Sequence, residues 1–176
     1  MIMEEIWGKS LAFVVIDAQK KFYLERSDWN ERLVVAVDGI NAFADEFRKA
    51  GKPVIFVRFN GPTCRPYEGD DGDDLFEGIR FEDGDIYVDK DHIDSFHDTD
   101  LEEIVRSHGC DTVVLAGTVA QFCVISTYYS AFEHNLKTYL AHDLCLGTDA
   151  KAEESVEYIC KVLTLDRIKR FFSEGE

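Results

Sequence analysis

The chain has 176 residues, 45% of them hydrophobic, which is typical of one globular domain with a sizeable core. Its formal net charge of −16 argues against nucleic acid and against an anionic membrane surface as partners. No apolar run approaches the roughly 20 residues that a membrane span needs. We therefore expect a single domain over residues 1–176.

The N-terminus and the cysteines indicate the compartment. The stretch MIMEEIWGKS carries early acidic residues and lacks the basic and long apolar regions of a signal peptide. The cysteine count, five, is odd, and no CxxC pair is present. A domain of this size without an export signal is not expected to depend on disulfides. The sequence thus predicts a cytoplasmic protein.

The first half of the chain alternates apolar runs with a helical pattern. Residues 11–16 (LAFVVI) are typical of a strand buried on both faces of a parallel sheet. Residues 31–50 then place apolar side chains at helical spacing, and Gly51 stands where a helix C-cap is expected. A second strand is expected at 53–59.

A long segment, residues 60–85, is rich in Gly, Asp and Glu and has no periodicity. Such a loop in a compact domain is usually a lid, a binding loop or an insertion, and the sequence does not decide among these. Its aspartates favour a solvated loop over a Ca²⁺ or Mg²⁺ site; they are Asp70, Asp71, Asp73 and Asp74.

The second half continues the alternation. A helix is expected at 99–108, where Thr99 and Glu102 have the spacing of a capping box, and Asp166 is expected to cap a last helix that reaches Phe172. The remaining expected strands are 86–88, 112–116, 136–141 and 160–165, and the remaining expected helices are 122–134 and 150–158. This order predicts an α/β fold, a three-layer αβα sandwich around a central six-stranded, mainly parallel, doubly wound sheet.

Three reactive side chains follow predicted strands: Asp17, Lys90 and Cys123. Ligands of such sheets bind beyond the carboxyl ends of the strands, so we expect these side chains at one edge. A helix N-terminus and a nearby lysine should lower the pKa of the Cys123 thiol. A carboxylate beside the thiol can accept the thiol proton and deliver it to a leaving amine, and backbone N–H groups at the helix start can hold an oxyanion. Each residue alone is more often structural, but together they are typical of an acyl-transfer site.

Three stretches carry a family resemblance. They are VVIDAQKKF (14–22), DKDHIDSFHDTDL (89–101) and GTVAQFCVIST (117–127). In this order and spacing they resemble the isochorismatase-like cysteine hydrolases, a family that includes nicotinamidases, N-carbamoylsarcosine amidohydrolases and ureidoacrylate amidohydrolases. The resemblance runs from about residue 11 to residue 165.

The resemblance implies a role for each matching residue. Cys123 would be the nucleophile, Asp17 the general base and acid, and Lys90 the group that holds the thiolate and orients Asp17. The peptide bond between Thr118 and Val119 would be cis.

Two further site features are implied by the same resemblance. The oxyanion would be held by the backbone N–H groups of Val119 and Cys123. Phe22 matches a pocket position of the family and is expected to contact the substrate. Ala120 and Gln121 stand where the family often has Thr and Asp, so the substrate contacts differ from the common pattern.

The activity implied is hydrolysis of a C–N bond in a small amide or ureido substrate through a Cys thioester, by a homo-oligomer (dimer or tetramer). Nicotinamidases bind a metal through an Asp-x-His pair and a second His after strand two. That stretch here, residues 56–76, contains no histidine, so we expect no metal and no other cofactor. His92 and His97 are expected to be surface or packing residues, and Arg58 and Arg65 are weak candidates for a carboxylate clamp.

Two alternatives stay open. One is a catalytically idle family member that acts as a binding or assembly protein. The other is a redox protein that uses Cys123 as a peroxide-sensitive thiol; the sequence shows no evident resolving cysteine, and Cys64 or Cys145 would serve only if the fold brings one of them close. A nucleotide-binding Rossmann protein is disfavoured because the first strand is not followed by a glycine-rich turn.

Overall fold

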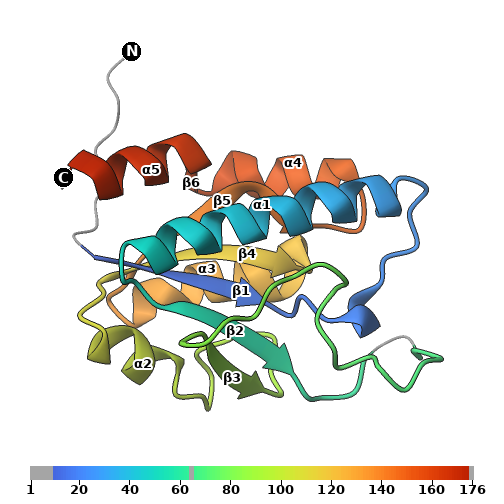
Figure 1. Ribbon diagram of the computed structural model, residues 1–176. Coiled ribbons are helices and arrows are strands. Elements are labelled where there is room, and N and C mark those ends of the chain that lie inside the picture. Colours follow the sequence, from blue (N-terminus) through green and yellow to red (C-terminus); the bar gives the residue numbers. More distant parts are fainter. Residues whose placement is uncertain (1–9, 64–65, 175–176) are drawn as a thin grey trace.

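The computed structural model describes residues 10–63 and 66–174, and they form one parallel sheet with helices on both faces (Figure 1). The strands are β1 (Leu11–Ile16), β2 (Val54–Phe59), β3 (Ile86–Lys90), β4 (Thr112–Thr118), β5 (Lys137–Leu146) and β6 (Val162–Leu163). The α-helices are α1 (Trp29–Lys49), α2 (Leu101–Ser107), α3 (Ile125–Glu133), α4 (Ala150–Ile159) and α5 (Leu165–Glu174). A 3₁₀ turn, η1 (Lys20–Phe22), and a π-helical turn, η2 (Ala120–Val124), complete the elements.

The strand order is β3-β2-β1-β4-β5-β6, and every strand pair is parallel. Helices α1 and α5 pack on one face of the sheet, and α2, α3 and α4 pack on the other. All six residues of β1 are buried because this strand lies in the middle of the sheet with a core on each face. The predicted three-layer, doubly wound α/β fold is confirmed. None of the described helices is long and apolar enough to cross a membrane.

Three strands are longer than predicted, and the first of them is β3, which continues to Lys90. β4 continues to Thr118, and β5 continues to Leu146, five residues beyond its predicted end at Ala141. The polar pair His142 and Asp143 ends the apolar pattern in the sequence, but both side chains are exposed and the apolar run resumes after them. β4 and β5 pair on both sides of a register shift, so the ladder extends past the irregularity.

Two predicted helix caps are not formed. Helix α2 begins at Leu101, and the carboxylate of Glu102 binds Arg106 and His134 in place of a capping-box contact with Thr99. Helix α5 begins at Leu165, so Asp166 lies inside its first turn and does not cap it. At the start of α2 the Thr99 hydroxyl accepts a hydrogen bond from the Leu101 N–H (3.3 Å), and at the start of α5 the Thr164 hydroxyl accepts one from the Arg167 N–H (3.4 Å).

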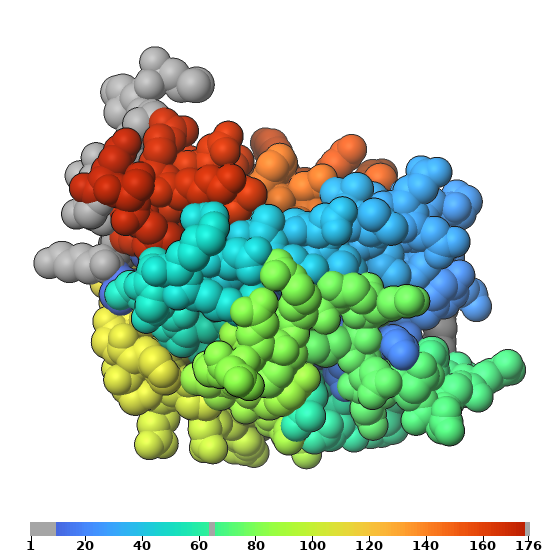
Figure 2. All heavy atoms as spheres, in the orientation of Figure 1, coloured from blue at the N-terminus to red at the C-terminus, as the bar shows by residue number. Residues whose placement is uncertain are grey.

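The described part of the loop 60–85 packs against the body of the molecule. Figure 2 shows this segment, in green, lying along α1. Asn41 of α1 bonds the backbone of Gly78 and Arg80, and Arg48 binds Asp85. The loop is therefore held to the first helix by specific polar contacts.

Candidate active site

The strand order reverses between β1 and β4, and the residues predicted to react gather at the carboxyl ends of the strands. Asp17 directly follows β1, Lys90 is the last residue of β3, and Cys123 lies in η2 just after β4. This edge is where ligands bind in doubly wound sheets. The fold thus brings together three residues that are separated by more than a hundred positions in sequence.

Asp17 and Lys90 form a buried ion pair. The Nζ atom of Lys90 lies 3.0 Å from Oδ2 of Asp17, and both side chains are 0% exposed. Lys90 and the Cys123 thiol are the side-chain groups that interact with this carboxylate. The carboxylate therefore has an opposite charge beside it and a thiol that can give it a proton.

The backbone holds both partners in place. The Asp17 N–H donates to the carbonyl of Val57 (2.9 Å), and Asp17 has a φ of +48°, a left-handed conformation that aspartate tolerates better than most residues. Lys90 stands opposite Phe59 in the ladder of β2 and β3. Its ammonium group also donates to the carbonyl of Ile93 (3.1 Å), which fixes the direction of the side chain.

Cys123 is buried, and its thiol interacts with the Asp17 carboxyl. Burial, followed by the negative charge of Asp17, raises the pKa of the Cys123 thiol to about 12, against the opposing effect of Lys90. The predicted lowering of this pKa is therefore wrong. Desolvation of a thiolate in the core, next to a carboxylate, outweighs the nearby lysine.

Burial also raises the pKa of Asp17, while Lys90 and the Cys123 thiol oppose this effect. A carboxylate with a raised pKa is a stronger proton acceptor than an exposed one. The Cys123 thiol is thus protonated at neutral pH, and a carboxyl group with an increased affinity for protons lies beside it.

The segment between β4 and Cys123 is shaped by Gly117. This glycine has a φ of +117° and pairs with Ile16 in the ladder. The following peptide bond, between Thr118 and Val119, is cis. Val119 is buried at the start of the π-helical turn, and the oxyanion contacts of Val119 and Cys123 stay a prediction.

Phe22 lies at the border of this region. It is partly buried, and its ring meets the ring of Phe59 edge-on with centroids 5.9 Å apart. The Phe59 ring lies 5.9 Å from Nζ of Lys90. The Phe59 ring thus lies between Phe22 and the Asp17–Lys90 ion pair. The contact of Phe22 with a substrate stays a prediction.

Several weaker candidates are engaged elsewhere or not described. Arg58 forms a two-pronged ion pair with Asp89 and stacks on Tyr87, so its guanidinium is already used. Cys64 and Arg65 lie outside the described residues. The four cysteines that the structure describes are free thiols; they are Cys110, Cys123, Cys145 and Cys160.

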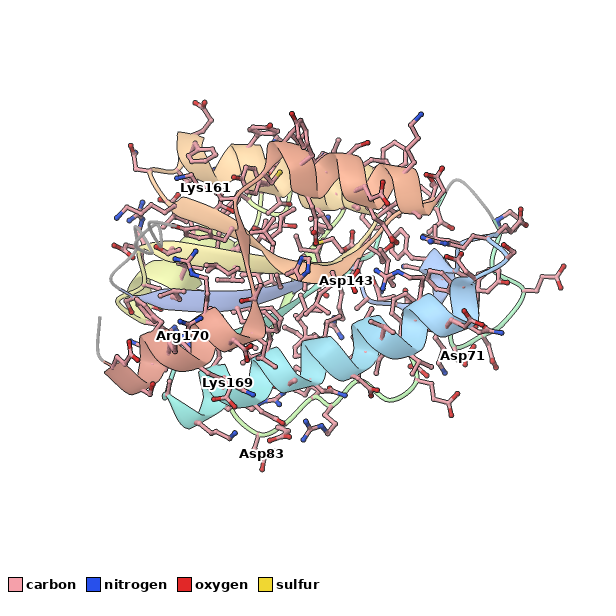
Figure 3. All side chains as sticks on the ribbon, turned by 90° about the horizontal axis from the view of Figure 1, so that it is seen from above. Asp71, Asp83, Asp143, Lys161, Lys169 and Arg170 are labelled. Carbon is pink, nitrogen blue, oxygen red and sulfur yellow. The ribbon has the colours of Figure 1, made fainter. Side chains whose placement is uncertain are left out.

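Three of the four aspartates that the sequence analysis named in the loop bind lysines. Asp71 and Asp74 pair with Lys20, and Asp73 pairs with Lys21. Figure 3 shows Asp71 at the end of the molecule where α1 begins. These pairs dock the loop onto η1, which follows the catalytic candidate Asp17 by three residues.

Sequence reasoning assigned no role to Gln19, although it belongs to the first motif. Its side chain is fully buried and binds the Phe59 backbone in both directions, accepting from the N–H (2.8 Å) and donating to the carbonyl (3.4 Å). Its amide also reaches Asp73 of the loop. Gln19 therefore links the end of β2 and the loop to the segment that follows Asp17. In the sequence, the only indication of this role was the position of Gln19 two residues after Asp17 in the first motif.

Most of the chain matches a known protein family. The isochorismatase domain model matches residues 11–161, which include all three candidate catalytic residues. This chain belongs to the isochorismatase family. The family that the three sequence motifs predict is confirmed, and the chain is therefore an isochorismatase-like hydrolase by family.

Relatives of this isochorismatase-family chain span most of its length. It is 26% identical over 148 residues to a secreted isochorismatase effector of Verticillium dahliae, covering 83% of this chain and 77% of the relative. It is 27% identical over 150 residues to the uncharacterized isochorismatase family protein YrdC of Bacillus subtilis, covering 84% and 79%. One relative is thus described as secreted, and the cytoplasmic location stays a prediction.

Solved structures show the same architecture. N-carbamoylsarcosine amidase from Thermoplasma acidophilum superposes with a TM-score of 0.74 at 27% identity, covering 89% of this chain and 97% of that one. Pyrazinamidase of Pyrococcus horikoshii, solved in complex with zinc, has a TM-score of 0.73 at 19% identity, covering 88% and 99%. The second likeness concerns the fold alone.

Proposed function

We propose that this chain is a cysteine hydrolase that cleaves the C–N bond of a small amide or ureido substrate through a thioester on Cys123. The observation that carries the proposal is the buried Asp17–Lys90 ion pair, 3.0 Å between Oδ2 and Nζ, in contact with the thiol of a buried cysteine. The likeness to an N-carbamoylsarcosine amidase, at 27% identity, supports a C–N bond as the target.

In the first half of the reaction, Asp17 removes the proton from the Cys123 thiol as the sulfur attacks the substrate carbonyl. A C–S bond forms, and the carbonyl π electrons move to oxygen. The oxyanion would be held by the backbone N–H groups of Val119 and Cys123. As the C–N bond breaks, the protonated Asp17 returns its proton to the leaving nitrogen, which departs as ammonia or an amine and leaves a thioester.

In the second half, Asp17 acts as a base toward water. It takes one water proton as the oxygen attacks the thioester carbonyl, and the C–S bond then breaks. The departing thiolate recovers the proton from Asp17, which restores the starting state. Each transferred proton passes through this carboxylate, the second proton of the water stays with the carboxylic acid product, and the proposed cycle uses no metal or cofactor.

Lys90 keeps its positive charge throughout and acts through electrostatics. It stabilises the Asp17 carboxylate before the reaction and the developing thiolate during it. The bond from its ammonium group to Ile93 (3.1 Å) holds the charge in one position, so little reorganisation is needed. Phe22 is proposed to line the pocket beside this pair.

The redox alternative has less support. A peroxide-sensing cysteine is normally an accessible thiolate with a low pKa, whereas Cys123 is 6% exposed and its pKa is raised to about 12. A catalytically idle family member would turn over no amide or ureide, so an activity assay distinguishes this alternative from the proposed hydrolase.

We also propose that the chain self-associates as a dimer or tetramer. Helices α3 and α4 expose large apolar side chains, which supports a shared surface there; these are Tyr129, Phe132, Tyr158 and Ile159. Light scattering after size-exclusion chromatography measures the mass directly.

The function is tested with a panel of primary amides, N-carbamoyl amino acids and ureides, with ammonia release as the readout. Cys123→Ala and Asp17→Asn should abolish release, and Cys160→Ala, which changes a partly exposed cysteine outside the site, should retain it. Acid quenching of the wild type with a good substrate should reveal an acyl adduct by mass on the peptide that carries Cys123. Turnover that persists in Cys123→Ala would refute the thioester mechanism.

A further inference from the structure

The turn that follows Lys90 is a rigid surface segment. The Ile93 carbonyl accepts a hydrogen bond from Lys90, the Ser95 N–H donates to Thr127 Oγ1 (3.0 Å), and Ser130 Oγ donates to Asp94 (2.7 Å). Ser95 and Thr127 are fully buried. Hydrogen bonds to β3 and α3 therefore hold residues 93–95, which lie between His92 and His97.

Two of those side chains are imidazoles that lie against each other. The rings of His92 and His97 have centroids 4.2 Å apart at an interplanar angle of 76°, and both are exposed. Asp98 approaches the same place, with Oδ2 3.5 Å from Nε2 of His97. One ligand atom from each of His92, His97 and Asp98 lies within 4.8 Å of the other two.

This arrangement has the chemistry of a metal site. Two imidazoles and one carboxylate are the donors that Zn²⁺ and its neighbours in the first transition row prefer, whereas Ca²⁺ and Mg²⁺ prefer oxygen ligands alone. At metal–ligand distances of about 2.0–2.2 Å, tetrahedral ligand atoms stand roughly 3.4 Å apart. The three side chains are exposed and their ligand atoms lie within 4.8 Å of one another, so metal binding would need them to move closer by up to about 1.4 Å.

The electrostatic surroundings favour a cation. Asp91 lies 3.3 Å from Nε2 of His92 and adds a second carboxylate at the rim. The whole chain carries a formal charge of −16, so a divalent ion is attracted to the surface before it is bound.

We propose that His92, His97 and Asp98 form a surface site for a divalent transition metal, with Zn²⁺ as the best fit, and with water completing its coordination. The ion would join residues 92 and 97–98 and so close the turn that carries Ile93, the acceptor of the Lys90 hydrogen bond. It would act as a structural clamp on this turn. The site is separate from the proposed hydrolysis, which runs through Asp17 and Cys123.

The test is zinc binding by isothermal titration calorimetry, on chelator-treated and dialysed full-length protein. A Cys123→Ala background prevents zinc from binding the active-site thiol. We expect one Zn²⁺ per chain. Loss of an outer-shell partner of a metal typically costs about tenfold or more in affinity, so His92→Ala and His97→Ala, which remove direct ligands, should each weaken binding by at least that factor.

The matched control is His142→Ala, which removes another exposed histidine next to a carboxylate, that of Glu157; it should bind zinc as the background does. If circular dichroism shows that His92→Ala or His97→Ala is misfolded, His97→Gln is used in place of that variant. In protein that retains the two histidines, zinc should also raise the melting temperature by mass action. Zinc binding that is unchanged in the His92→Ala, His97→Ala double variant, or no binding in the background, would overturn the proposal.

Discussion

A Cβ atom placed on Gly117 would lie 2.0 Å from the carbonyl oxygen of Ile16. The two residues face each other in the β1–β4 ladder, one position before Asp17 and at the start of the turn that leads to Cys123. Their close contact sets the spacing between the general base and the nucleophile of the proposed mechanism.

We predict that Gly117→Ala destabilises the fold by about 3 kcal/mol or more and abolishes turnover. The new methyl group would meet backbone atoms that cannot move without opening the ladder, and the φ of +117° is unfavourable for alanine. Gly109→Ala is the control, because Gly109 also has a positive φ (+68°) but open space around it, so only the conformational cost of about 1–2 kcal/mol applies. Urea denaturation measures both. Equal losses in the two variants would show that contact with Ile16 is unimportant.

Lys90→Met should cost about 3–5 kcal/mol of unfolding free energy, because it leaves the buried Asp17 carboxylate without its opposite charge. The double variant Lys90→Met, Asp17→Asn should recover most of that loss, since no charge then remains to be desolvated. Thermal or urea unfolding at neutral pH gives the comparison. A double variant as unstable as Lys90→Met would mean that lost packing, and not the unpaired charge, is the cause.

Asp17→Asn should lower the pKa of the Cys123 thiol while it removes hydrolysis. The negative charge of Asp17 is the second contribution, after burial, to the raised pKa of about 12, and asparagine removes that charge. The labelling rate of Cys123 by iodoacetamide, followed by peptide mass, should therefore rise at a lower pH in the variant. Cys160 is the internal control: burial and Glu157 raise its pKa, also to about 12, so its profile should not change. An unchanged profile for Cys123 would argue against contact between the thiol and Asp17.

The acid limb of kcat/KM should lie above the pH of about 3.9 at which an ordinary aspartate titrates. Burial raises the pKa of Asp17, and the mechanism needs its ionised form. Activity is therefore expected above the raised pKa and should fall as the pH drops through it. A pH series of initial rates on the best substrate measures this limb. Full activity that persists down to pH values near that of a free aspartate would exclude Asp17 as the base.

The ion pairs of Lys20 and Lys21 should control how tightly the acidic loop is docked. Replacing both lysines with alanine removes the partners of Asp71, Asp73 and Asp74, so limited proteolysis within residues 66–76 should become several-fold faster. High salt should have a similar effect on the wild type, because exposed ion pairs are screened. Lys49→Ala, which breaks a pair with Glu46 inside α1, should leave cleavage of the loop unchanged. If the double variant is cleaved no faster, the backbone contacts of the loop suffice to hold it, and a lid role loses its support.

The sequence by itself determined the fold and the identity of the candidate site. Apolar runs such as residues 11–16 are long and uniform enough to identify buried strands, and the rule that ligands bind at the carboxyl ends of parallel strands placed Asp17, Lys90 and Cys123 on one edge. These features depend on local pattern and on chain order, which a sequence contains in full.

Only the tertiary structure decided the electrostatics and the long-range contacts. The pKa of the Cys123 thiol depends on how completely water is excluded from it and on its approach to Asp17, so the local cue of a helix start gave the wrong sign. The meeting of His92 with His97, the bonds of Gln19 to Phe59 and the docking of the acidic loop on Lys20 likewise arise from the path of the chain in space. Desolvation and Coulomb interactions act through distance and burial, and neither is encoded by the spacing of residues along the sequence.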